Sequence, residues 1–161
     1  MVDLHPAVAV LAPLVGTWTG SGTGEYPTIE TFGYSETVTF GHIGKPFLAY
    51  TQRTKAVDDD RALHAETGYV RVPAPGRVEW LLAHPTGIVE VLEGPLDIAA
   101  DGTVTMQLTS SIGRSASAKE VTALSRTLTL RGDHLSYTVR MAAVGQPLRH
   151  HLAAVLRKEQ P

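Results

Sequence analysis

Residues 16–29 have the sequence GTWTGSGTGEYPTI, and this stretch decides the fold. Within it, Gly20, Gly22 and Gly24 alternate with larger residues, in phase with Trp18. Glycine weakens the interior of a strand, so its repetition at every second position indicates a strand with one bare face. Another group must approach that face closely. In a small closed sheet, this group would be a side chain that plugs the barrel, a crossing backbone at a corner, or a flat ligand.

The rest of the chain predicts an all-β fold. Its 15 glycines and 10 prolines break the sequence into short segments, most of which alternate between apolar and polar residues as strands do. Turn-forming pairs such as Asp101-Gly102 and Gly132-Asp133 separate these segments. The ten expected strands cover residues 15–23, 32–41, 46–56, 62–72, 77–84, 87–94, 95–99, 103–111, 118–130 and 134–143.

Helices are expected only at the two ends of the chain. Pro6 suits the first turn of a short helix over residues 6–14, which would close one mouth of the barrel. Pro147 likewise predicts a helix over residues 147–157, in which His151 lies within an apolar stripe and His150 points the opposite way. The stripe consists of Leu148, Leu152, Val155 and Leu156.

Composition limits the classes of function. A chain of 161 residues can bury a core unaided, so residues 1–161 are expected to form one domain. The absence of cysteine excludes disulfides, thiolate catalysis and cysteine–metal sites. A net charge of −2 with scattered Lys and Arg gives no basic surface for nucleic acid. Without a signal-peptide pattern or an apolar run of the ~20 residues that cross a membrane, we expect a cytoplasmic protein without a membrane partner.

Seven histidines in a chain without cysteine suggest a metal or heme site. His64 and His84 lie in predicted strands, but the alternation of neither strand settles whether these imidazoles face the interior. An imidazole alone on an apolar helical face, as predicted for His151, is more often a hydrogen-bonded core residue than a ligand. A zinc site built from these three histidines would lack the short ligand spacing typical of zinc sites.

The glycine-rich stretch resembles the signature of the nitrobindin family of heme-binding β-barrels. Its first three residues, Gly-Thr-Trp, also match the Gly-x-Trp triplet that opens lipocalins and fatty-acid-binding proteins. The chain is similar to mycobacterial-type, single-domain nitrobindins over nearly its whole length, and this resemblance implies a ten-stranded antiparallel β-barrel. Further matching segments are GKPFLAYTQ (44–52), LHAETGYVR (63–71), Lys119-Glu120-Val121, LSYTVRM (135–141) and QPLRHHLAAVL (146–156).

The resemblance also implies a heme b site. Nitrobindins supply the axial iron ligand from the position that His151 occupies. The resemblance also places His64 and His84 on the distal side of the heme pocket, although His84 lies at a position where relatives vary. A porphyrin needs an apolar wall, for which we expect Val139 and Met141 on one face of a strand. Its propionates need hydrogen-bond donors at the mouth of the pocket, and we expect Thr28 and Lys119 to supply them.

The function implied by the resemblance is isomerisation of peroxynitrite to nitrate at ferric heme, together with binding of nitric oxide, in detoxification or sensing of reactive nitrogen species. No catalytic residue beyond the heme iron is then required. Two other hypotheses remain open: a carrier of fatty acids or other small hydrophobic molecules without heme, and a sensor that signals through a partner protein. The sequence leaves the oligomeric state open, a homodimer included.

Overall fold

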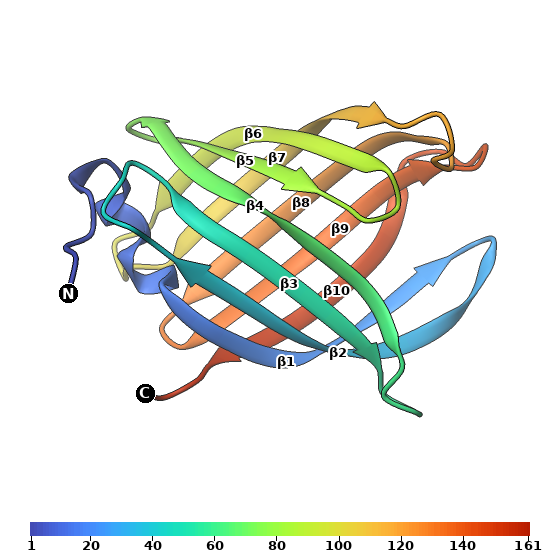
Figure 1. The fold of residues 1–161 in the computed structure, drawn as a ribbon, viewed down its shortest axis with the longest axis horizontal. Coiled ribbons are helices and arrows are strands. Elements are labelled where there is room, and N and C mark those ends of the chain that lie inside the picture. Colours follow the sequence, from blue (N-terminus) through green and yellow to red (C-terminus); the bar gives the residue numbers. More distant parts are fainter.

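In the computed structural model, which describes residues 1–161, ten antiparallel strands close into one barrel (Figure 1). Each strand pairs with its neighbours in sequence, and β1 pairs with β10, so no strand edge is left unpaired. The strands are β1 (Gly16–Tyr26), β2 (Ile29–Gly41), β3 (Leu48–Ala56), β4 (Ala62–Ala74), β5 (Arg77–Ala83), β6 (Ile88–Ile98), β7 (Val104–Arg114), β8 (Val121–Arg131), β9 (His134–Ala143) and β10 (Arg149–Lys158).

The predicted N-terminal helix is confirmed as a 3-10 helix, η1 (Pro6–Leu14), which lies at the left end of the barrel in Figure 1. Its Val8, Leu11 and Leu14 side chains are buried in the main apolar cluster. The indole N–H of Trp18, at the start of β1, donates to the Leu14 carbonyl over 2.8 Å. This end of the barrel is therefore closed by apolar packing, and the turns that follow the odd-numbered strands form the opposite, open end. No helix in the structure has the length and apolar character needed to cross a membrane.

The bare face of the glycine-rich strand is filled by side chains of the barrel itself. A Cβ atom on Gly22 would overlap the ring of Tyr34 and the backbone of β10, and one on Gly24 would overlap the ring of Phe32. Both rings project from β2, which pairs with β1 along its length. Of the three expected occupants, side chains that plug the barrel and a close backbone therefore fill this face.

The predicted helix over residues 147–157 is wrong, because this segment is β10 and closes the barrel between β1 and β9. Ala154 and Leu156 are buried while Val155 is 55% exposed, an alternation of period two. A helix here would leave the edges of β1 and β9 unpaired, so the ladder hydrogen bonds of two neighbouring strands outweigh the local helical stripe.

The expected count of ten strands is confirmed, but with a different set of strands. The segments expected as two strands over residues 87–94 and 95–99 form one continuous strand, β6, which runs through Gly94 and Pro95. The terminal strand β10, which was expected to be a helix, is the tenth strand. The expected all-β, ten-stranded antiparallel barrel is thus correct, with one short helix in place of two.

Candidate functional site

A network of charged side chains crosses the middle of the barrel interior. The guanidinium of Arg126 on β8 donates to both oxygens of Glu66 on β4, at 2.8 and 3.2 Å, and to Glu90 Oε2 on β6 at 2.7 Å. Burial alone would raise the pKa of both carboxyl groups, but the Arg126 charge and hydrogen bonds from neighbouring side chains lower these pKa values instead. Both carboxylates are therefore ionised at neutral pH.

The third buried carboxyl group, that of Glu36 on β2, behaves differently. It accepts hydrogen bonds from Tyr137 and Gln52, each 2.7 Å long, and has no cationic side chain in contact. Its Oε1 atom is buried without a partner. Burial therefore raises the pKa of Glu36, whereas that of Glu66 is lowered. The interior thus holds two kinds of buried acid, distinguished by contact with Arg126.

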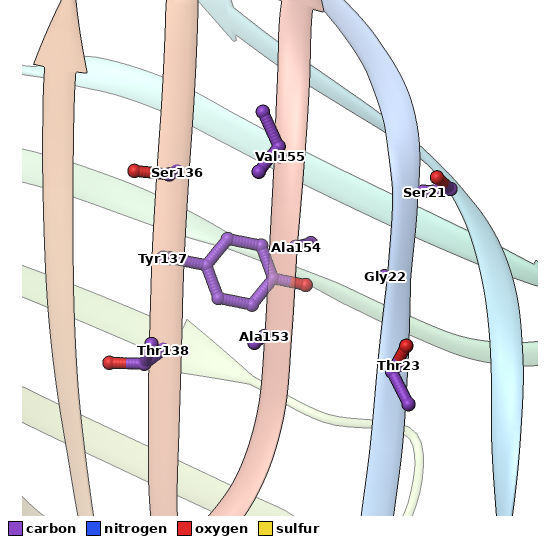
Figure 2. Close-up of a pocket in the computed structure, with 9 residues that line it drawn as sticks. All are labelled: Ser21, Gly22, Thr23, Ser136, Tyr137, Thr138, Ala153, Ala154 and Val155. Carbon is purple, nitrogen blue, oxygen red and sulfur yellow. The ribbon is translucent and has the colours of Figure 1, made fainter.

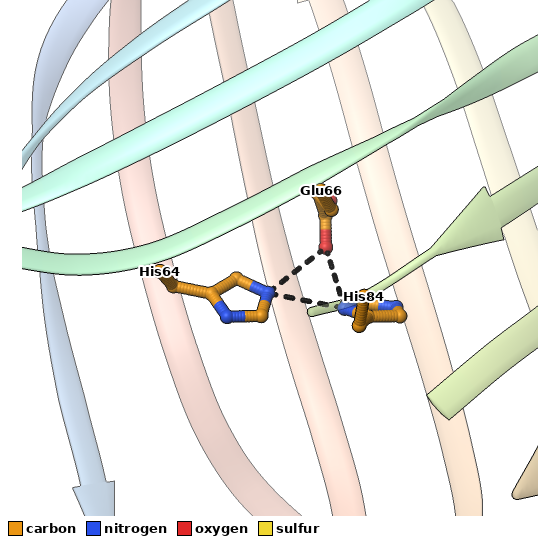
Figure 3. Close-up of side chains that lie close together, drawn as sticks. All are labelled: His64, Glu66 and His84. Atoms are coloured by element: carbon orange, nitrogen blue, oxygen red, sulfur yellow. Dashed lines mark hydrogen bonds and ion pairs between the residues drawn. The ribbon is translucent and has the colours of Figure 1, made fainter. Parts of the chain in front are cut away.

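Beside this network, two histidines meet at the open end of the barrel (Figure 3). The Nε2 atom of His64, on β4, lies 3.0 Å from Nδ1 of His84, which directly follows β5. The other ring nitrogen of His84 is hydrogen-bonded to Glu90. Both imidazoles face inward, because each reaches the carboxylate of Glu66 at 3.4–3.6 Å. The structure thereby settles an orientation that the strand alternation left open.

His151 lies at the same end of the barrel, on a β-bulge. His150 pairs with Arg140 and Leu152 pairs with Val139 across β9, so His151 is the extra residue between two paired positions. Bulges of this kind are common at barrel rims and re-aim a side chain. Here His150 is exposed on the outer side, whereas His151 is half-buried. The predicted contrast between the two histidines therefore holds, although a bulge and not a helix produces it.

Two contacts fix the orientation of the His151 ring. Its Nδ1 atom lies 3.0 Å from the backbone carbonyl of Glu25, which can only accept, so Nδ1 carries the proton. The Tyr26 ring packs edge-on against the imidazole, with 5.4 Å between centroids. Burial lowers the pKa of His151, so its imidazole is neutral at pH 7. The Nε2 lone pair makes no hydrogen bond and is free to coordinate.

The other expected site residues lie at this open end, but only some of them approach the interior. Val139 is buried and Met141 half-buried on β9, both on its inward face. Thr28 is exposed in the turn between β1 and β2, and Lys119 is exposed in the loop between β7 and β8. Neither Thr28 nor Lys119 contacts the inward-facing residues through a hydrogen bond. The structure therefore brings together the apolar wall and the histidines, and leaves the two expected propionate donors on the rim.

The whole barrel matches one protein family. Residues 7–158 fit the model of the THAP4-like, heme-binding beta-barrel domain. The chain belongs to this heme-binding barrel family. The crystal structure of Rv2717c from M. tuberculosis superposes with a TM-score of 0.95 at 52% identity, covering 98% of this chain and 100% of that one. Membership therefore rests on both sequence and fold.

Curated relatives of this family member are named for one activity. A "Peroxynitrite isomerase" of Nocardia farcinica is 59% identical over 159 residues, covering 98% of this chain and 94% of the relative. A "Peroxynitrite isomerase 1" of Mycolicibacterium paratuberculosis is also 59% identical, and a "Peroxynitrite isomerase 2" of Mycobacterium avium is 58% identical. In both cases the match covers 98% of each chain.

The residues at the open end fit the group that the family name implies. Heme ligation by histidine needs a neutral imidazole with a free nitrogen lone pair, and metal-ligating histidines usually donate their other N–H to a backbone carbonyl or carboxylate. His151 meets both requirements through Glu25. The apolar body of a porphyrin needs an apolar wall, which Val139, Met141 and Leu152 supply on neighbouring strands.

The charged residues Glu66, Glu90 and Arg126 were not expected from the sequence as members of the site. A signal was present, since each stands in phase with the apolar residues that face inward on its own strand. Glu90, for example, lies between Ile88 and Leu92, both of which are buried. A charged residue on an inward face must find a partner, and sequence alone does not say which one.

A shallow groove of about 350 Å³ lies on the outer wall of the barrel, over β1, β9 and β10 (Figure 2). Small side chains line it, among them Ser21, Thr23 and Ala153. Its one aromatic residue, Tyr137, directs its hydroxyl group to Glu36 in the interior. The groove therefore offers no charged group and no free metal ligand, and the chemistry of this protein concentrates at the open end.

Proposed function

We propose that this protein isomerises peroxynitrite to nitrate with a bound heme b, which His151 ligates through Nε2. The single observation that carries the proposal is the His151–Glu25 hydrogen bond, because it fixes the tautomer that an axial ligand requires. The family model and the names of relatives at 52–59% identity support the cofactor and the reaction.

His151 would hold the heme iron, and two contacts keep its imidazole in one orientation. The Glu25 carbonyl retains the Nδ1 proton, and the edge of the Tyr26 ring restricts rotation of the imidazole. Tyr26 is itself anchored, since its hydroxyl oxygen lies 3.1 Å from the Met141 carbonyl and accepts from the Ala143 N–H at 2.9 Å. A partner hydrogen bond of this kind raises the basicity of a ligating imidazole.

The surrounding residues bind and shield the cofactor. Val139 and Met141 would provide an apolar wall for the porphyrin, and His64 would offer a polar imidazole to its bound ligand. Thr28 and Lys119 lie on the rim, where a hydroxyl and an ammonium group would meet the two propionates of the porphyrin. In this arrangement Val139 and Met141 would cover the apolar body of the porphyrin, and Thr28 and Lys119 would hold its charged end at the rim.

When bound, ferric heme supplies a Lewis acid that activates the weak O–O bond of peroxynitrite. Rearrangement to nitrate transfers no atom to the protein, so the chain needs neither a nucleophile nor a general acid of its own. Its task is to keep the reacting species enclosed and away from other reductants. Nitric oxide, a smaller ligand, would bind at the same place. The protein would then act in detoxification or sensing of reactive nitrogen species. We expect it to do so in the cytoplasm, as a monomer or homodimer.

The interior speaks against the alternative of a fatty-acid carrier. Carriers of this kind enclose a largely apolar cavity that takes an alkyl chain. Here the buried ion pairs of Arg126 with Glu66 and Glu90 occupy the middle of the barrel. An alkyl chain that filled the middle of the barrel would have to displace these ion pairs, at a cost of about 1–3 kcal/mol for each polar group left unpaired.

The test compares His151→Ala with His150→Ala. We expect His151→Ala to abolish the Soret shift on addition of hemin and the acceleration of peroxynitrite decay, because it removes the axial ligand. His150→Ala should retain both, since this side chain points outward. Stopped-flow decay, nitrate yield and protection of free tyrosine from nitration measure the reaction. Equal decay rates for heme-loaded and heme-free protein would contradict the isomerase activity, and equal loss of heme in both variants would contradict the ligand assignment.

A further inference from the structure

The open end holds a second set of metal-binding groups, separate from His151. Nε2 of His64, Nδ1 of His84 and Oε2 of Glu66 form a triangle with sides of 3.0, 3.4 and 3.6 Å (Figure 3). Tetrahedral zinc with ligand bonds of about 2.0–2.1 Å places its donor atoms about 3.3–3.4 Å apart. The three distances lie within about 0.4 Å of this spacing, so small side-chain movements bring all three donors to one small divalent ion.

Two of the three groups of the triangle, His84 and Glu66, are held in place by a further contact. His84 is hydrogen-bonded through Nε2 to Glu90, which leaves Nδ1 directed at the triangle. Glu66 accepts a 2.8 Å hydrogen bond from Tyr50 and is bound by Arg126, so its position is fixed. Metal-ligating histidines usually have such a carboxylate partner on the remote nitrogen. The outer contacts of a metal site are thus present.

The local charge also favours a cation. Two carboxyl groups, those of Glu66 and Glu90, contact a single guanidinium, that of Arg126, so the cluster holds more acidic than basic side chains. A divalent ion would be coordinated by Nε2 of His64 and Nδ1 of His84, which lie 3.0 Å apart, and would add positive charge beside the two carboxyl groups.

We propose that His64, Glu66 and His84 form a second, non-heme site for a first-row divalent transition ion. Two imidazoles and one carboxylate are the protein ligands of catalytic zinc sites and of non-heme iron(II) sites, both of which keep open positions for solvent or substrate. The site is reached from the barrel mouth, since the His64 side chain is 33% exposed whereas Glu66 is buried. This metal site shares His64 with the distal side of the proposed heme pocket, but metal binding here requires no heme.

The test uses the full chain without heme and adds Zn²⁺ or Co²⁺. We expect one ion per chain, measured by titration calorimetry and by metal analysis after gel filtration, and a visible Co²⁺ spectrum typical of low coordination number. His64→Ala should weaken binding by more than the ~10–100-fold that loss of an outer partner of a ligand costs. This variant is preferred because His64 is the most exposed of the three ligands. His84→Asn serves as a second variant, with circular dichroism to verify its folding.

Two other histidine variants serve as controls. His134→Ala removes a histidine whose side chain is 45% exposed at the start of β9, and this variant should leave the affinity for Zn²⁺ unchanged. His151→Ala should also leave it unchanged, so failure of the heme proposal and failure of the metal proposal are distinguishable. The proposal is overturned if the unaltered chain binds no ion stoichiometrically, if His64→Ala binds as tightly as the unaltered chain, or if binding is lost in His151→Ala instead.

Discussion

The two ends of the barrel contain different kinds of side chain. The end closed by η1 is packed with apolar side chains, including Trp18, Trp80 and Leu156, all at most 2% exposed. The middle and the open end hold the ion pairs of Arg126 and the three inward-facing or half-buried histidines. The difference shows how the molecule separates stability from chemistry: hydrophobic burial at one end supports polar groups that are costly to bury at the other.

Substitutions at the apolar end are expected to cause the largest losses in the free energy of unfolding. Trp18→Ala should lower the free energy of unfolding by about 3–5 kcal/mol, because it leaves a cavity beneath η1 and removes the hydrogen bond to Leu14. Val155→Ala, on the outer face of the barrel, should change it by no more than about 0.5 kcal/mol. Urea denaturation measures both. Similar losses in the two variants would show that the apolar end does not dominate stability.

The polar middle is expected to respond to substitution according to contact with Arg126. Glu66→Gln should lower the free energy of unfolding by about 1–3 kcal/mol at neutral pH, because it leaves the guanidinium less well paired. Glu36→Gln should be close to neutral or stabilising, because the amide resembles the protonated acid that burial favours. A larger loss for Glu36→Gln than for Glu66→Gln would contradict the assignment of charge within the network.

The same two residues should respond oppositely to pH. The pKa of Glu66 is lower in the folded state than its ordinary value of 4.5, so its stabilisation is complete above that pH and is lost as pH falls toward the folded value. The pKa of Glu36 is raised, so its contribution is complete below 4.5 and is lost as pH rises through the folded value. The free energies of unfolding of Glu66→Gln and Glu36→Gln, measured by denaturation at several pH values, should therefore differ most at neutral pH and least in acid.

The sequence predicts most of the fold because the barrel is built from local patterns. Alternation, turn residues and the proline that begins η1 are each visible within a few residues. The segment 149–158 is the exception, since it carries a helical stripe and a period-two alternation at once. Pairing with β1, more than 120 residues earlier in the chain, decides between the two patterns, and local propensity contains no information about that partner.

Part of the candidate site can likewise be predicted from the sequence, and part becomes visible only in the structure. His151 is singled out by family resemblance, yet the bulge and the Glu25 carbonyl that orient it become visible only in three dimensions. The positions of Glu66, Glu90 and Arg126 suggest inward-facing charges, but their pairing joins β4, β6 and β8 across the barrel. The roles of Thr28, Lys119, Val139 and Met141 toward heme stay predictions.

The smallest expected effect belongs to the rim. Lys119→Ala should weaken heme binding by no more than about fivefold, because an exposed ammonium group in a loop is well solvated and interacts weakly with a propionate. The loss should shrink further as salt is added, since screening acts on exposed charges. Hemin titrations at low and high ionic strength measure it, with Lys55→Ala, on β3, as a matched control for loss of one positive charge. A salt-independent loss of tenfold or more for Lys119→Ala would mean that the loop between β7 and β8 folds over the cofactor and buries this contact, and the open end would then be less open than its strands alone imply.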